Sequence, residues 1–469
     1  MSQADAQTAP STAAAGGNEN LSRGLRTRHL TMMGLGSAIG AGLFLGTGVG
    51  IRVAGPAIIL AYAVTGLITV LIMRMLGEMV AARPSAGTFS AYAEQAFGPL
   101  AGFSVGWLYW FMMVMIMGAE MTGAAAIMAS WFGVAPWVPA LVCVLFLAAV
   151  NLAAVRGFGE FEFWFAFIKV AVIIAFLVIG VLLIFGLLPG HTFVGTSNIT
   201  AQGFMPSGIS GVAAGLLVVA FAFGGIELVT IAAAESEDPE RSVHAAVNTI
   251  IWRIGIFYIG SVLVIAFLLP FDQIMDAQTA AESPFTMVLS QAHIPGIVGI
   301  MEAIIVIALL SAFNAQLYGS SRLCYSLACR GDAPKVFTKV SVAQVPIAAV
   351  VLSVIFAFLS VGLQWWNPPG LLDFLLSSIG GCLVVIWLTI IASYLRLHPR
   401  LEARGEITSV RMWGCPWLAW LTLAGVLAIV ALMLADASAR GQILAVVVVC
   451  AVIVACAGLV ALYRRRTRA

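Results

Sequence analysis

Four ionisable side chains stand deep inside long apolar runs of this sequence: Glu120, Lys169, Glu227 and Glu302. A charged side chain at the centre of a lipid bilayer costs at least about 2.5–3.5 kcal/mol, so charges at that depth mark a pathway or a proton relay by default. Because burial disfavours the charged form of a lysine, the Lys169 amine is a candidate proton site. We predict proton coupling by Lys169, Glu227 and Glu302, and a ligand contact or a relay role for Glu120.

Each of these charges also has a purely structural interpretation. Glu120 can form a hydrogen bond to neighbouring small residues, and Lys169 can extend toward the inner lipid headgroups. Glu227 can cap a helix N-terminus, where an acidic group is stabilising by about 0.3–1 kcal/mol. Glu302 can face a neighbouring helix or an outer vestibule. These alternatives stay open at the level of the sequence.

A glycine-rich stretch, GLGSAIGAGLFLGTGVG at residues 34–50, interrupts an otherwise apolar run. An interior glycine costs a helix about 1 kcal/mol relative to alanine, so unwinding near residues 38–42 is cheap. Close helix packing through small residues at i and i+4 is the alternative explanation. A second glycine pair, Gly224 and Gly225 in FAFGGIE, lies in the middle of a later apolar run. The two stretches together favour a pair of broken helices.

Two broken helices would bind a ligand that carries both charges. The N–H groups near Ala41 and Gly42 would present about half a positive charge, which suits a carboxylate. Freed carbonyl groups near Ala38 and at residues 221–223 would suit an ammonium group. A zwitterion or a similar ω-amino acid satisfies both ends. The candidate binding residues are Ala38, Ile39, Gly40, Ala41, Gly42, Glu120, Phe221, Ala222, Phe223 and Gly224.

The composition requires these residues to be positioned by membrane helices. The chain is 61% hydrophobic and 9% charged, with a mean hydropathy of +1.04, whereas soluble proteins are about 25% charged. About 20 apolar residues cross a bilayer as a helix, and no run alternates as a barrel strand does. Twelve spans are predicted, at residues 30–52, 56–81, 98–131, 134–154, 160–188, 208–236, 245–269, 288–320, 345–363, 370–395, 412–434 and 440–463.

The distribution of positive charge predicts a multi-pass plasma membrane protein with both termini in the cytosol. All but three of the 23 Lys and Arg residues then lie at the cytosolic side, Arg253 among them. The exceptions are Arg52 and Arg440 outside and Lys169 within the membrane. Residues 1–20 have little to bury and are predicted to be a disordered cytosolic tail.

The sequence lacks the motifs of several other functional classes. The seven cysteines form no CxxC pair and the histidines lack metal-ligand spacing, so neither a disulfide nor a metal site is expected. No Walker sequence or nucleophile motif is present, so ATP drive and enzymatic activity are not expected. The expected partners are a small molecule and membrane lipid, with no nucleic acid and no cofactor besides a coupling proton. The oligomeric state is left open.

The all-α chain is predicted to contain two inverted five-helix repeats, because the breaks fall in spans one and six. The first repeat covers residues 21–190 and the second covers residues 200–398. The last two spans and a basic cytosolic tail occupy residues 405–469. Helices one and six would be the broken helices of the two repeats.

Several motifs occur in a recognisable order, among them LSRGLRTRHLTMMGLGSAIGAGLFLGTG, GEFEFWFAFIKV, FAFGGIELVTIAAAESEDPE and SRLCYSLACRGDAPK. Together they resemble the amino acid permeases of the amino acid, polyamine and organocation superfamily, from about residue 21 to the end. The resemblance implies a leucine-transporter-like fold and amino acid uptake coupled to protons by alternating access.

The same resemblance implies roles for individual residues. Phe221 stands where the family has an aromatic gate, and Lys169 is similar to a span-five lysine that replaces a sodium site. Glu227 is similar to a glutamate implicated in gating and in the response to protons. Where relatives carry Ser or Thr, this chain has Ala41, which removes one hydroxyl contact.

Within the family, GEFEFW, IAAAES, IWRIGIFY, RGDAP and RMWGCPWLAW look most like the γ-aminobutyrate (GABA) permeases. We therefore expect import of GABA or a similar ω-amino acid with a proton. The alternatives are a permease for aromatic, basic or D-alanine, glycine and serine substrates, or an amino acid exchanger. A channel is a weaker alternative, because two broken helices in twelve spans are typical of transporters.

Overall fold

The computed structural model describes residues 39–84, 88–153, 158–227, 239–276, 283–341, 345–407, 410–435 and 437–468. Within these ranges the chain forms helices and no β-strand. The helices are α2 (Ala41–Phe44), α3 (Gly46–Ala54), η1 (Gly55–Ala57), α4 (Ile58–Ala82), α5 (Thr88–Phe97), α6 (Pro99–Phe132), α7 (Trp137–Ala153), α8 (Phe158–Ile184), α9 (Ser197–Thr200), α10 (Gly208–Ala222), α12 (Pro239–Trp252), η2 (Arg253–Ile259), α13 (Gly260–Leu268), α14 (Phe271–Asp276), α15 (Pro284–Gln291), α16 (Ile297–Cys329), η3 (Lys335–Thr338), α17 (Ile347–Trp366), α18 (Leu371–Ala403), α19 (Trp417–Ala435) and α20 (Ala437–Arg468).

Nine helical runs in the described part of the chain are long and apolar enough to cross a membrane. The sequence predicts twelve spans, and the difference has a local cause in three places. Residues Ala41–Ala82 count as one run because α2, α3, η1 and α4 follow one another closely. The apolar helices Trp137–Leu152 and Gly208–Ala222 are too short to count. The twelve-span count and the boundaries of the two repeats stay predictions.

Glycine and proline set the helix ends in these apolar runs. Gly55, with φ of 66°, and Pro56 separate α3 from α4. Pro99 occupies the first position of α6, where its missing N–H is tolerated. At the other end of α6, Gly133 adopts the left-handed conformation and donates its N–H to the Ala129 carbonyl at 2.9 Å.

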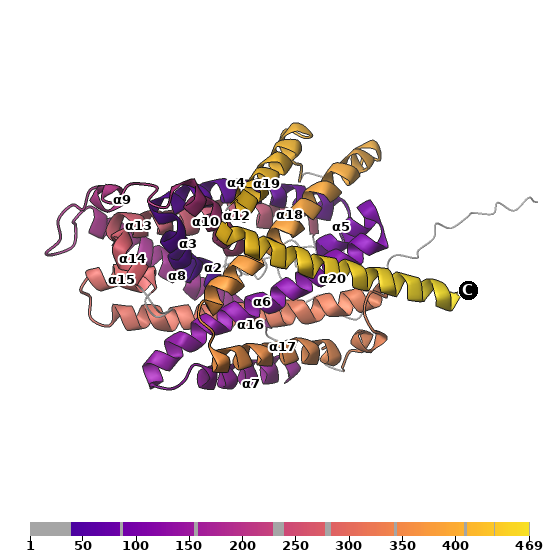
Figure 1. The fold of residues 1–469 in the computed structure, drawn as a ribbon, viewed down its shortest axis with the longest axis horizontal. Coiled ribbons are helices and arrows are strands. Elements are labelled where there is room, and N and C mark those ends of the chain that lie inside the picture. The colour runs from indigo at the N-terminus through magenta and orange to yellow at the C-terminus, as the bar shows by residue number, and fades with distance from the viewer. Residues whose placement is uncertain are drawn as a thin grey trace, which may run out of the picture.

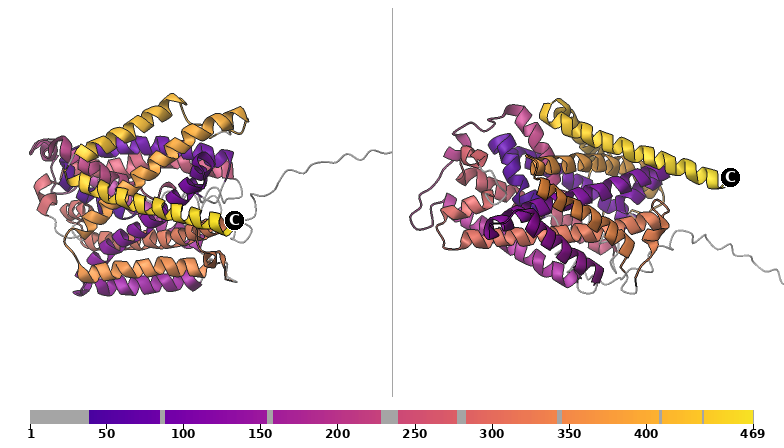
Figure 2. Two further views of the ribbon diagram at one scale, coloured as in Figure 1. Left: turned by 45° about the vertical axis from the view of Figure 1, so that its right-hand side comes forward. Right: turned by 60° about the horizontal axis from the view of Figure 1, so that its bottom comes forward.

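The long helices pack along the length of the molecule. Helices α6 and α16 lie side by side, and α7 pairs with α17 along one face (Figures 1 and 2). Helix α10 packs against α3, α4 and α18, and residues 39–50 of the first glycine-rich stretch are buried. Helix α20 crosses the outside of α6 and α18. The short helices α9, α14 and α15 gather at the end opposite the C-terminal end of α20 (Figure 1).

Ion pairs join helix ends in the segments that the sequence assigns to the cytosol. Arg83 donates two hydrogen bonds to the Glu406 carboxylate, at 2.6 and 3.0 Å. These bonds hold the pKa of the Glu406 carboxyl below its ordinary value. Arg330 pairs with Glu94 at 3.1 Å. The Arg83 pair ties the end of α4 to the segment that follows α18, and the Arg330 pair ties α5 to the end of α16. The orientation of the termini stays a prediction.

Candidate functional site

The first glycine-rich stretch contains a helix start in the protein interior. Helix α2 begins at Ala41, and Gly40 before it is extended, with φ of −148° and ψ of −145°. The Ala41 N–H donates to both carboxylate oxygens of Glu120, at 3.1 and 3.0 Å. Glu120 comes from the middle of α6 and is buried. A buried carboxylate therefore occupies the N-terminus that the sequence predicts for a ligand carboxylate.

Ile39 and Gly40 complete this contact from the side that precedes α2. Both residues are buried, and a methyl group placed on Gly40 would lie 2.5 Å from Glu120 Oε1. Only glycine lets the Glu120 carboxylate approach this closely. Ala38 lies outside the described residues, as does the rest of predicted span one before it. The prediction that span one resumes as a helix on that side therefore stays a prediction.

The second glycine-rich stretch contains a helix end. Helix α10 ends at Ala222, and residues 223–226 form turns. The N–H of Gly224 donates to the Phe221 carbonyl at 2.8 Å, which tightens the last turn. Gly225 has a φ of 87°, a conformation that favours glycine. The interruption falls inside predicted span 208–236, of which residues 228–236 lie outside the described residues.

The two interruptions meet backbone to backbone. A methyl group placed on Gly42 would lie 2.7 Å from the Cα of Ala222 and 3.0 Å from its carbonyl oxygen. No side chain fits between α2 and the end of α10 at this point. The start of α2 and the end of α10 are therefore in direct backbone contact. A binding site for both ends of a zwitterion requires the two helix ends to lie this close.

We predict that Gly42→Ala disrupts the site, because its methyl group must push the α10 backbone away. Gly46→Ala is the matched control: four residues further on, its methyl group would meet its nearest neighbour at an ordinary 3.6 Å. Ligand affinity of the purified variants checks the prediction. We expect a loss of about tenfold or more for Gly42→Ala, since a shift of about 1 Å at a binding site has effects of that size, and little change for Gly46→Ala. Equal affinities would show that the two helix ends can separate without consequence.

A layer of aromatic rings lies beside the interruption of α10. The ring of Phe223 packs against Tyr258 at 5.0 Å and against Tyr62 at 6.0 Å between ring centroids. Tyr62 and Tyr258 are 6.1 Å apart. We call Tyr62, Phe223 and Tyr258 the aromatic cluster. Phe221, the predicted gate, is buried and lies 3.8 Å from the position of a Gly46 methyl group, against α3.

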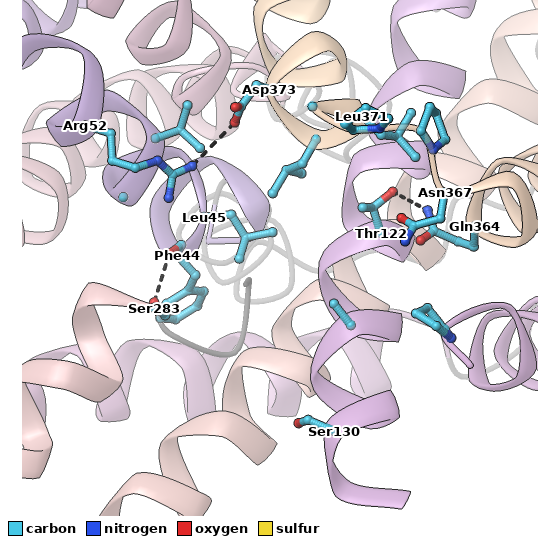
Figure 3. Close-up of a pocket in the computed structure, with 18 of the residues that line it drawn as sticks. Phe44, Leu45, Arg52, Thr122, Ser130, Ser283, Gln364, Asn367, Leu371 and Asp373 are labelled. Carbon is cyan, nitrogen blue, oxygen red and sulfur yellow. Dashed lines mark hydrogen bonds and ion pairs between the residues drawn. The ribbon is translucent and has the colours of Figure 1, made fainter. Parts of the chain in front are cut away.

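A cavity of about 630 Å³ is lined by residues of α2, α3, α6 and α15 and by the segment that joins α17 to α18. Figure 3 shows Arg52 and Asp373 paired at one side of it, with 3.5 Å between their charged groups, and Thr122 and Gln364 at another. Phe44 and Leu45 also line the cavity. They follow Ala41 in the chain within one helical turn. The cavity therefore reaches the helix that starts at the Ala41 contact with Glu120.

Lys169 and Glu227 are both buried in the protein interior. Lys169 comes from α8, is fully buried, and lies close enough to Glu120 for the two charges to interact. Glu227 directly follows the turns at residues 223–226 and interacts electrostatically with Arg253. The capping interpretation and the proton role of Glu227 both stay predictions.

Glu302 is placed differently from the other three charges. Its carboxylate accepts a 2.7 Å hydrogen bond from the indole N–H of Trp131, whose side chain is exposed at the end of α6. This contact agrees with the structural alternative of a neighbouring helix. The proton-coupling role of Glu302 stays a prediction. Among the described residues, no group of three or more His, Cys, Asp or Glu side chains could hold a metal ion.

Sequence reasoning missed two residues near the site. Tyr258 completes the aromatic cluster, and Arg253 is fully buried, although its position near one end of predicted span 245–269 assigned it to the cytosolic side. The available signal was the motif IWRIGIFY, in which an arginine stands between apolar residues. Both residues lie in η2, a π-helix, and such irregular turns often occur at functional sites.

Known proteins resemble this chain over nearly its whole length. Residues 29–469 match the family model described as amino acid permease. The aromatic amino acid transport protein AroP of Corynebacterium glutamicum is 68% identical over 433 residues, which cover 92% of this chain and 94% of that protein. The γ-aminobutyric acid permease of Bacillus subtilis is 42% identical over 427 residues, 90% of each chain.

A solved structure shares the fold at low sequence identity. The manganese transporter of Eremococcus coleocola, determined in complex with an aromatic bis-isothiourea substituted compound, aligns with a TM-score of 0.54. The alignment covers 92% of each chain at 13% identity. At this identity the similarity concerns the fold alone, which is that of a membrane transporter.

Proposed function

This chain belongs to the amino acid permease family, and we propose that it imports an aromatic amino acid together with a proton. The observation that carries the substrate class is the 68% identity to a protein named for aromatic amino acid transport, against 42% to a GABA permease. The sequence motifs favoured GABA and left aromatic substrates as an alternative. The more similar relative now favours that alternative, and the GABA preference stays a prediction.

The geometry of the site supports a zwitterion with a large apolar side chain. The N–H groups at the start of α2 suit the substrate carboxylate, and the carbonyl groups at the end of α10 suit its ammonium group. The aromatic cluster offers ring faces beside these helix ends. Aromatic rings in edge-to-face contact gain about 0.5–1.5 kcal/mol beyond the burial of their area. A short ω-amino acid has no ring with which to make these contacts.

In this conformation the Glu120 carboxylate occupies the position beside the Ala41 N–H that we assign to the substrate carboxylate. Because the Ala41 N–H already donates to Glu120, an incoming carboxylate must displace it. Two carboxylates so close together repel each other, and protonation of Glu120 relieves the repulsion. Lys169 lies close enough to interact with the displaced group. Substrate binding and proton uptake are thereby linked at one backbone N–H.

We predict that Glu120→Gln binds phenylalanine several-fold more tightly than the wild type at neutral pH. A neutral amide oxygen competes less strongly for the Ala41 N–H than a carboxylate does, because charge-assisted hydrogen bonds are about twice as strong. The same variant should lose accumulation driven by a pH gradient. Equilibrium binding and proteoliposome uptake measure the two effects. Weaker binding by the variant would instead indicate that Glu120 contacts the substrate ammonium group.

The substrate class is tested by competition. We expect phenylalanine, tyrosine and tryptophan to inhibit the uptake of labelled phenylalanine into proteoliposomes, and GABA to inhibit it at least about tenfold less. The reason is the loss of ring contacts, at about 1.4 kcal/mol for each factor of ten. Preferential inhibition by GABA would restore the prediction from the sequence motifs. Uptake that requires internal amino acid and ignores the pH gradient would indicate exchange.

The proton role of Lys169 is tested by two replacements at the same position. Lys169→Met removes the positive charge. Lys169→Arg keeps a positive charge on a group whose proton does not dissociate in proteins. We expect both variants to lose accumulation driven by a pH gradient while they retain counterflow exchange. Accumulation by Lys169→Arg at the wild-type level would show that the charge of Lys169, rather than its proton exchange, is what transport needs.

A further inference from the structure

Arg253 is a buried cation whose hydrogen-bonding capacity is unused in this conformation. Its side chain has no solvent exposure, and its Nε, Nη1 and Nη2 atoms have no hydrogen-bond partner in the part of the chain that the structure describes. A guanidinium group presents five N–H donors in a planar fork that matches a carboxylate. Burying such a group without a partner is strongly unfavourable. The site around Arg253 is therefore incomplete without an anion.

The π-helical geometry of η2 places this cation beside the aromatic cluster. A π-helix forms hydrogen bonds from residue i to residue i+5, so Arg253 and Tyr258 lie over each other on one face. Their side chains interact electrostatically, and the Tyr258 ring packs on Phe223. On α4, a methyl group placed on Gly66 would lie 2.7 Å from Ile254, so η2 packs tightly there.

The chain direction places Arg253 beyond the aromatic cluster as seen from the cavity. Helix α13 follows η2 and leads to α14 and α15, and Ser283 and Pro284 at the start of α15 line the cavity. Arg253 precedes Tyr258 and therefore lies one turn closer to α12, away from the cavity end. A molecule that enters through the cavity meets the start of α2 before it reaches Arg253.

Glu227 is an acidic group that interacts electrostatically with Arg253. It directly follows the turns at residues 223–226 that end α10. Within the described residues, the three guanidinium nitrogens of Arg253 form no hydrogen bond to Glu227 or to any other group. The planar fork of Arg253 can therefore accommodate a second, mobile carboxylate.

We propose that Arg253 forms a second binding station for the substrate carboxylate, on the inward side of the aromatic cluster. This inference rests on the proposed function, because it takes an amino acid as the mobile anion. The substrate ring stays on the aromatic cluster while its carboxylate passes from the Ala41 N–H to the guanidinium group of Arg253. The carboxylate then has hydrogen-bond donors on both sides of the cluster.

The test compares two ligands that differ in the carboxylate. L-Phenylalanine carries it, and β-phenylethylamine has the same ring and ammonium group without it. We would measure the equilibrium affinity of purified full-length protein for both ligands and divide the affinity for L-phenylalanine by the affinity for β-phenylethylamine. A role for Arg253 in carboxylate binding predicts that Arg253→Gln lowers this ratio about tenfold or more while the affinity for the amine changes little. Arg253→Lys keeps the charge without the fork and should give an intermediate ratio.

Two results would overturn the inference. An unchanged ratio in both Arg253 variants, with both ligands weakened equally, would make Arg253 a structural residue. Equal losses in Arg253→Gln and Glu227→Gln, with no further loss in the double variant, would make Glu227 its partner. If Arg253→Gln does not fold, the ratio of Arg253→Lys decides alone. Failure of the wild type to bind phenylalanine would overturn the proposed function as well, whereas an unchanged ratio overturns only the second station.

Discussion

The Ala41 N–H in the protein interior is the constraint on which the rest of the site depends. A helix that starts in the middle of a protein leaves backbone donors that must be satisfied, since an unpaired polar group in an apolar interior costs several kcal/mol. Glu120 satisfies this one, and Gly40 and Gly42 have no side chains because Glu120 and the α10 backbone occupy that space. One backbone donor thus accounts for the buried Glu120 carboxylate, for the absence of side chains at Gly40 and Gly42, and for the close contact between the ends of α2 and α10.

The buried charges form two interacting pairs near the aromatic cluster. Lys169 interacts with Glu120 near the start of α2, and Arg253 interacts with Glu227 near the end of α10. Each pair contains one acid and one base, so neither pair carries a large net charge when all four groups are ionised. Moving one proton or one carboxylate between the pairs would change this balance. In the proposed cycle, that sensitivity would couple a charged substrate to a proton.

Sequence patterns predicted the features that depend on local backbone cost. The glycines at residues 34–50 and the pair at 224–225 indicated helix interruptions. In the described residues, α2 begins at Ala41, within the first stretch, and α10 ends at Ala222, two residues before the glycine pair. The partner of the Ala41 N–H could not be predicted, because a sequence does not show which side chain packing brings to it. The burial of Arg253 could not be predicted, because counting charges by position assigns a side of the membrane and does not show which side chains a π-helix places in the protein interior.

A carboxylate that crosses a membrane protein needs hydrogen-bond donors at every step, because its free energy rises steeply wherever it is buried without them. The start of α2 can supply such donors only while the substrate remains beside it. Since the α10 backbone closes directly on α2 at Gly42, the substrate must leave that contact before the inward side can open. In this proposal, the guanidinium group of Arg253 beyond the aromatic cluster would meet this requirement, because the described residues leave its hydrogen-bonding capacity unused and a substrate carboxylate would fill it.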